Sequence, residues 1–196
     1  GNEEIILSDR ALAFLVSELA RYDFTRTEVD AKGAAYQEIV GDNLRGDRGQ
    51  YFTPRGAVRL VIDILDPKPD ELFLDPASGP AGFIVACIDH QNRRFHAEAN
   101  LPIGAESTEE FRSIQDRLAE YARTKLFGAD FDQFLVRAAQ MNIVMAAGDE
   151  AHLFHMDSLE FPQGHLSGVA AAQKHIPFGI VKVLGTNPPF GSDIPI

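Results

Sequence analysis

The sequence predicts an α/β protein built on a parallel sheet, and three observations support this. Four short apolar runs lie at residues 71–75, 125–130, 151–157 and 179–186. Stretches with the apolar spacing of helices separate the first three runs. Each run also leads into a polar residue or a turn, which is how strands end before a crossover. At 196 residues the chain is long enough for one domain, so we expect one doubly covered sheet with helices on both faces.

Helical patterns precede the first strand. Residues 4–22 carry an apolar stripe at helical spacing, and Asp30 to Val40 predicts a second short helix. A polar, glycine-rich loop follows. The next helix is expected to start near Pro54, with Thr53 as its cap. Its inward face is predicted to be Ala57, Val58, Leu60, Val61, Ile64 and Leu65.

Two stretches interrupt the alternation of strands and helices. Between a helix predicted at 81–90 and the second strand, residues 93–124 contain an inserted helix. Ser107 and Glu110 there have the spacing of a capping box, and a stripe follows at helical spacing, so we expect a surface helix docked on the domain. Residues 163–177 are rich in Gly, Ser and Ala and are predicted to be a loop before the last strand.

Acidic residues follow three of the predicted strands. Asp75 begins a turn of small residues that continues to Gly82, and such a turn lets backbone N–H groups approach a ligand. Asp130 ends the second strand, where folds of this kind bind ribose hydroxyls, and Asp132 is the more natural helix cap. Asp157 follows the third strand. The alternatives at these three places are a tight turn, a helix cap and a loop carboxylate, none of which needs a ligand.

The most specific pattern is Asn187-Pro188-Pro189-Phe190, directly after the fourth strand. Two prolines fix the backbone and remove two donors. The Asn187 side-chain oxygen and the following carbonyl are then rigid acceptors, which suit an amino group. The Phe190 ring offers a face to a planar base or amide. A proline-rich turn without function is the alternative.

Five blocks in this order resemble the amino-methylating, S-adenosylmethionine-dependent DNA methyltransferases. The likeness is greatest to the modification subunit of type I restriction–modification systems. The family's Gly-Gln-aromatic-aromatic-Thr-Pro segment is matched by residues 49–54, and its Asp-Pro-Ala-Cys/Ser-Gly turn by 75–79. Its acidic residue after the second strand is matched by Asp130. Residues 156–159 match its third block imperfectly, and residues 187–190 match the Asn-Pro-Pro-Phe block outright.

The resemblance implies a Rossmann-like methyltransferase sheet and methyl transfer to the exocyclic N6 of adenine in duplex DNA. It makes 1–48 the end of an N-terminal helical region and 49–196 the N-terminal part of the catalytic domain. The implied catalytic residues are Asn187, Pro188, Pro189 and Phe190. The implied cofactor-binding residues are Gln50, Tyr51, Phe52, Thr53, Pro54, Arg55, Asp75, Ala77, Ser78, Gly79, Pro80, Gly82, Asp130, Phe131, Asp157 and Ser158.

The chain departs from the family pattern at Pro80 and Ala81, where the family usually has Ser or Thr and then Gly. Pro80 lacks a hydroxyl and an N–H, and Ala81 restricts a turn that uses glycine. The family's later strands and DNA-engaging region do not follow Phe190, so we expect a fragment that is not an autonomous enzyme. The alternatives are methylation of cytosine N4 or a non-catalytic assembly subunit. Protein-glutamine and rRNA-guanine methyltransferases share Asn-Pro-Pro-aromatic but usually lack the Gln-Tyr-Phe-Thr-Pro block.

Composition constrains the partners. A formal charge of −11 gives no overall attraction to phosphate backbones. If DNA is the substrate, the basic surface is local or comes from another chain, and the resemblance implies a specificity subunit, a restriction subunit and a second copy of this subunit. The single cysteine, Cys87, excludes an internal disulfide and a multi-thiolate zinc site, and no metal is expected. No apolar run reaches the ~20 residues of a membrane span, so we expect a cytoplasmic protein.

Overall fold

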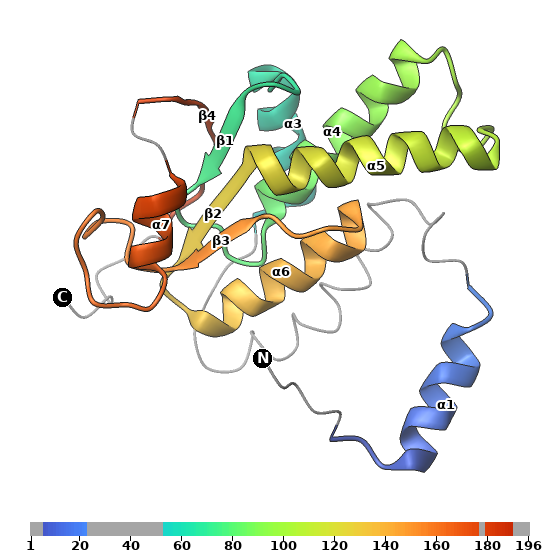
Figure 1. Ribbon diagram of the computed structural model, residues 1–196, viewed down its shortest axis with the longest axis horizontal. Helices are drawn as coiled ribbons and strands as arrows, with labels where there is room; N and C mark the ends of the chain where they lie inside the picture. Colours follow the sequence, from blue (N-terminus) through green and yellow to red (C-terminus); the bar gives the residue numbers. More distant parts are fainter. Residues whose placement is uncertain (1–5, 23–52, 177–178, 190–196) are drawn as a thin grey trace.

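The computed structural model describes residues 6–22, 53–176 and 179–189, and these contain a four-stranded parallel sheet (Figure 1). The strands are β1 (Leu72–Asp75), β2 (Leu126–Asp130), β3 (His152–His155) and β4 (Val181–Leu184), in the spatial order β3-β2-β1-β4. All three neighbouring pairs run parallel. The predicted α/β class and parallel sheet are confirmed, and the carboxyl ends of the four strands lie at one edge.

The register of the strands aligns the residues that leave this edge. Asp75 on β1 lies opposite Gly128 on β2, and Asp130 lies opposite His155 on β3. Gly128 has no room for a side chain, because a Cβ there would come within 2.7 Å of Leu153 Cδ2. On the other side of β1, pairing with β4 continues as far as the N–H of Gly185, which donates to the Leu74 carbonyl at 3.2 Å.

Three of the described helices, α4 (Gly82–Glu98), α5 (Thr108–Lys125) and α6 (Gln133–Ala147), cover one face of the sheet. A further helix, α3 (Arg55–Leu65), packs on α4. The strands alternate, so Phe73 and Leu126 point to this side and join the larger core. Its fully buried members include Ile62, Ile84, Ile88, Leu118 and Ile143. Burial of these side chains is the main force that holds the helices against the sheet.

The opposite face carries α7 (Val169–His175), so helices cover both faces as predicted. Phe127, Ala129 and Phe154 point to this side and pack with Val169 and Ala172 of α7. The prediction of a plain loop over 163–177 was therefore wrong. Gly168 lets the helix start directly against β3, because a Cβ at this position would lie 2.5 Å from the His155 nitrogen. Gly168, one of the small residues that indicated a loop, is therefore required by this close approach.

The expected insertion is a helical hairpin. α4 continues eight residues past the predicted end, to Glu98, and α5 returns to the sheet beside it (Figure 1). The predicted capping box at α5 is confirmed: Ser107 accepts from the Glu110 N–H, and the Glu110 carboxylate accepts from the Ser107 N–H. Ile114, Leu118 and Tyr121 are buried. The hairpin is thus docked through an apolar stripe, as the sequence predicts.

Two helices before the sheet differ from expectation. In α3 the buried residues are Val58 and Ile62, whereas Leu60 and Ile64 of the predicted inward face are 60% and 72% exposed. The reason is that α3 packs on α4 and not on the sheet, so one narrow side of the helix is covered. The first predicted helix is α1 (Asp9–Leu19), capped by Ser8, but none of its residues is buried. The helix predicted at 30–40 lies outside the described residues.

None of the helices in the described ranges is long and apolar enough to cross a bilayer.

Candidate active site

The structure brings the predicted polar residues together at the carboxyl edge of the sheet. Asp75 and Asp130 are the last residues of β1 and β2. Asp157 lies two residues beyond β3, and Asn187 three residues beyond β4. In open parallel sheets this edge is where ligands bind. The edge therefore combines three carboxyl groups with one rigid amide.

Asp75 is the most deeply buried of these groups, with 1% of its surface exposed. Burial raises the pKa of its carboxyl to about 6, and the negative charge of Asp130 adds to the rise. The Ala77 N–H, which donates to Asp75 Oδ1 at 3.1 Å, and the nearby Thr186 hydroxyl partly offset it. A cation or a strong hydrogen-bond donor beside this carboxyl would stabilise its ionised form.

The turn after β1 combines unusual backbone conformations with tight support. Gly79 has φ 51° and Ala81 has φ 69°, so both lie in the left-handed region. Glycine adopts this conformation freely, whereas the Cβ of Ala81 makes it unfavourable by about 1–2 kcal/mol. Asn142 of α6 donates from Nδ2 to the Pro80 carbonyl at 2.9 Å and holds the turn in place. The sequence predicts that Ala81 restricts a turn that usually contains glycine, and Ala81 does adopt the left-handed conformation that glycine favours.

Asp130 uses both oxygens on the backbone. Oδ2 accepts from the Gly79 N–H at 2.8 Å, and Oδ1 accepts from the Asp132 N–H at 2.8 Å. Asp132 caps α6, as predicted. The expectation that capping by Asp132 leaves Asp130 free needs correction, since Asp130 also ties the β1 turn to β2. Each carboxylate oxygen still has a lone pair for a ligand hydroxyl, and burial raises the pKa of this carboxyl as well.

The loop after β3 is joined to the same turn. Ser158 donates from Oγ to the Pro76 carbonyl at 2.5 Å. Asp157 Oδ1 accepts from the Leu159 N–H two residues later, at 2.9 Å, which is a local Asx turn. One oxygen of Asp157 is thus used locally. The β1 turn is therefore fixed by β2, β3 and α6 together, which preorganises this edge.

Asn187 cannot form the turn that Asp157 forms. An Asx turn needs the N–H two residues later, and both following residues are prolines. Its Nδ2 instead donates to the Thr53 hydroxyl at 2.9 Å, across 134 positions of the chain. Among the described residues no donor reaches its Oδ1. That the amide oxygen accepts from an amino group stays a prediction.

The remaining predicted site residues divide into two sets. Gly82 starts α4 directly after the turn, Arg55 starts α3, Pro54 precedes it, and the Phe131 ring is 65% exposed beside Asp130. Gln50, Tyr51, Phe52 and Phe190 lie outside the described residues.

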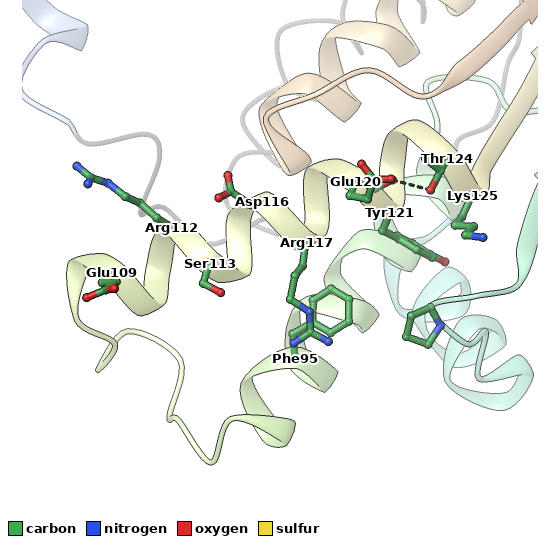
Figure 2. Close-up of a pocket in the computed structure, with 11 residues that line it drawn as sticks. Phe95, Glu109, Arg112, Ser113, Asp116, Arg117, Glu120, Tyr121, Thr124 and Lys125 are labelled. Atoms are coloured by element: carbon green, nitrogen blue, oxygen red, sulfur yellow. Dashed lines mark hydrogen bonds between the residues drawn. The ribbon is translucent and has the colours of Figure 1, made fainter.

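A separate hollow of about 860 Å³ lies along α5, away from the strand ends (Figure 2). Arg117 extends across it, with its guanidinium 3.7 Å from the centroid of the Phe95 ring and 2.6 Å from Glu98. Both acidic and basic side chains line this hollow. The hollow contains none of the predicted site residues, so it belongs to the α4–α5 hairpin and not to the candidate site.

Residues 27–194 match the N-6 DNA Methylase family. The chain belongs to the N-6 DNA methylase family. The resemblance drawn from the five sequence blocks is confirmed, and the matched range contains every described residue of the candidate site.

Individual relatives of this N-6 DNA methylase chain are named as restriction–modification proteins. It is 27% identical over 106 residues to the type I restriction enzyme EcoEI methylase subunit of Escherichia coli, which covers 53% of this chain and 20% of that protein. It is 24% identical over 168 residues to the type II restriction enzyme and methyltransferase RM.BcgI of Heyndrickxia coagulans, covering 85% of this chain and 22% of that protein. The chain thus spans about a fifth of the length of these relatives.

A solved structure shares the fold of the N-6 DNA methylase chain. It is the protein from Vibrio vulnificus YJ016 assigned as a modification subunit of a type I restriction enzyme. The TM-score is 0.56 at 24% sequence identity, over 85% of this chain and 30% of the other.

Sequence reasoning did not find two residues of this edge, Thr186 and Asn142. Thr186 lies beside Asp75, and its position before Asn187 was the available signal. Asn142 had no signal beyond its polar side chain in an apolar helix, because its bond to Pro80 spans 62 positions. A buried Asn among apolar helical residues is a weak hint of a tertiary hydrogen bond.

The described residues suit a ligand that carries a cation and hydroxyl groups. Asp75 would accept from an ammonium group, and Asp130 from hydroxyls. The Ser78 hydroxyl is buried and has no hydrogen-bond partner among the residues described. Such an unpaired group is unfavourable in the free protein and is satisfied when a ligand supplies the partner.

Proposed function

We propose that this chain forms the cofactor-binding and amine-recognition part of an enzyme that methylates the exocyclic N6 of adenine in duplex DNA. S-adenosylmethionine is the proposed methyl donor, and the complete protein is proposed to be the modification subunit of a restriction–modification system. Methylation of N6 rather than of cytosine N4 is supported by the family to which the chain belongs.

One observation carries the proposal. Asn187 lies at the same sheet edge as Asp75 and Asp130, its Nδ2 is bound to Thr53, and its Oδ1 has no donor among the described residues. A site for a hydroxylated, cationic cofactor and an acceptor for an amine therefore share one edge. A non-catalytic subunit would have no need for both.

The strand-end residues would hold S-adenosylmethionine, which carries an ammonium group, a carboxylate and ribose hydroxyls. Asp75 is suited to the ammonium group, and Asp130 to the ribose hydroxyls. Phe131 offers an exposed ring at the same place, and Asp157 retains one carboxylate oxygen. When bound, this cofactor supplies an electrophilic methyl group.

The chain's own contribution to the chemistry is positioning. The lone pair of an exocyclic amine is delocalised into the base. Asn187 Oδ1 and the Pro188 carbonyl would accept the two amine hydrogens and draw the nitrogen toward tetrahedral geometry. Phe190 would stack on a base turned out of the duplex. No general base is needed before attack, so the rate enhancement comes mainly from orientation.

The negative net charge of the chain bears on the partners that the proposed function needs. At −11 the chain does not attract a phosphate backbone as a whole. The proposal therefore includes a specificity subunit that supplies basic surface and selects the DNA sequence, a restriction subunit, and a second copy of the modification subunit. The assignment of relatives as methylase subunits of type I restriction enzymes supports such an assembly.

The test is methyl transfer by the complete chain in its complex. Tritiated methyl incorporation into duplex DNA, with mass spectrometry of the nucleosides, should yield N6-methyladenine. Asn187→Ala should abolish transfer while the Kd of S-adenosylmethionine stays within about twofold. Asn100→Gly, on the exposed tip of the α4–α5 hairpin, is the matched control and should transfer normally. Methylcytosine as the product, or full transfer by Asn187→Ala, would contradict the proposal.

A further inference from the structure

Thr53 has a role that its position before a helix does not explain. The expected cap of α3 was the Thr53 side chain. In the structure Pro54 occupies the N-cap position, and no side chain caps the helix. The Thr53 hydroxyl is therefore not used by α3. It accepts from Asn187 Nδ2 at 2.9 Å instead.

From this contact we infer that Thr53 is a positioning residue for Asn187, an inference that rests on the proposed function. An Asn side chain has two orientations of nearly equal shape, one with the oxygen and one with the NH₂ facing a given point. Only the first can accept hydrogens from a target amine. With Nδ2 bound to Thr53, the oxygen is the group that faces away from Thr53.

The local sequence makes an outside partner necessary. The backbone N–H two residues after an Asn can bond its side chain in an Asx turn, but Pro188 and Pro189 have no N–H. Among the described residues, Thr53 is the only one that bonds the Asn187 side chain. The two prolines thus free the amide oxygen, and Thr53 supplies the anchor that they remove.

Both partners lie next to elements that pack in the core. Thr53 enters α3, whose Val58 and Ile62 are buried against α4. Asn187 leaves β4, whose Val183 is buried and whose pairing with β1 extends to Gly185. The packing of α3 and the pairing of β4 therefore bring Thr53 and Asn187 together.

The experiment uses the complete chain in its complex and three variants. Thr53→Val keeps the shape and removes the hydroxyl. Thr53→Ser keeps the hydroxyl and is the rescue. Thr108→Val, at the exposed start of α5, is the matched control. The measurements are the single-turnover rate of methyl transfer and the Kd of S-adenosylhomocysteine by calorimetry.

Thr53→Val should lower the transfer rate about 2- to 10-fold, the effect of losing one hydrogen bond. The Kd should change less than about twofold, and Thr53→Ser should restore most of the rate. An unchanged rate would overturn the inference. A rate loss matched by weaker cofactor binding would also overturn it, because Thr53 would then be a cofactor contact.

A spectroscopic measurement separates this inference from the proposed function. In protein labelled with ¹⁵N on asparagine, the side-chain amide signals of Asn187 are those that vanish in Asn187→Ala. Thr53→Val should shift them, and Thr108→Val should not. If the wild-type complex transferred no methyl group, the proposed function would fail while this shift would still test the contact. Unshifted Asn187 signals in Thr53→Val would refute the contact.

Discussion

Replacing Asp75 with Asn should stabilise the folded domain at neutral pH. The folded protein holds this carboxyl at 1% exposure with a pKa near 6, against 3.8 for an ordinary aspartate. Between these values the unfolded chain is ionised and the folded chain is protonated. The folded state then binds more protons, so stability falls as pH rises through this window. Above the folded-state pKa, the full free-energy cost of ionising the buried Asp75 carboxyl destabilises the folded state.

The magnitude follows from the pKa change. Raising the pKa from 3.8 to about 6 corresponds to about 3 kcal/mol at pH 7.5 and about 1 kcal/mol at pH 4.5. Asn keeps the acceptor for the Ala77 N–H, and its NH₂ can donate to Thr186. Asp75→Asn should therefore gain up to about 3 kcal/mol near pH 7.5, and the gain should shrink as pH falls.

Cys87 provides a local probe for this measurement. It is fully buried on α4, and burial raises the pKa of its thiol well above the ordinary value, so it reacts with thiol reagents when the domain unfolds. Labelling of the Cys87 peptide in urea, read by mass spectrometry, gives the unfolding free energy of this domain within the complete chain. Asp70→Asn, on an exposed loop, is the control. A destabilised Asp75→Asn protein, or a gain independent of pH, would refute the reasoning.

Four further outcomes are expected. Gly128→Ala should destabilise the domain by more than about 2 kcal/mol, because its Cβ would overlap Leu153, and thiol labelling would show this. Asn142→Ala should lower the unfolding free energy by about 1–3 kcal/mol, since it leaves the Pro80 carbonyl unpaired. Asp130→Ala should weaken S-adenosylmethionine binding by about 1–3 kcal/mol, and unchanged calorimetry would remove Asp130 from the site. In the complete protein, hydrogen exchange should show protected amides on the edge of β4 that pairs with no described strand, since an unpaired apolar edge is an association hazard.

The parts of the fold that were predictable are those with local signals. The four strands, the capping box of α5 and the Asp132 cap of α6 each depend on residues close together in the sequence. The direction in which α3 faces was not predictable. Its sequence is apolar around most of the helix, and the side that packs was decided by α4, which lies later in the chain.

The candidate site likewise combines features that were predictable from local sequence with features that were not. The types and positions of Asp75, Asp130 and Asn187 followed from strand ends and motif spacing. Their partners did not, because each bond joins distant positions: Gly79 to Asp130 across 51 residues, and Thr53 to Asn187 across 134. Such bonds depend on how the chain crosses over between strands, and no local pattern encodes them.

These long-range bonds also explain why the two halves of the proposed reaction share one edge. The cofactor side is built by the β1 turn, which Asp130, Ser158 and Asn142 fix from three directions. The amine side is built by Asn187, which Thr53 fixes from α3. Both sides are anchored to β1, through its own turn and through its pairing with β4. Because both sides leave neighbouring strands of one sheet, the pairing of β1 with β4 sets their relative position, and a reaction based on positioning requires such preorganisation.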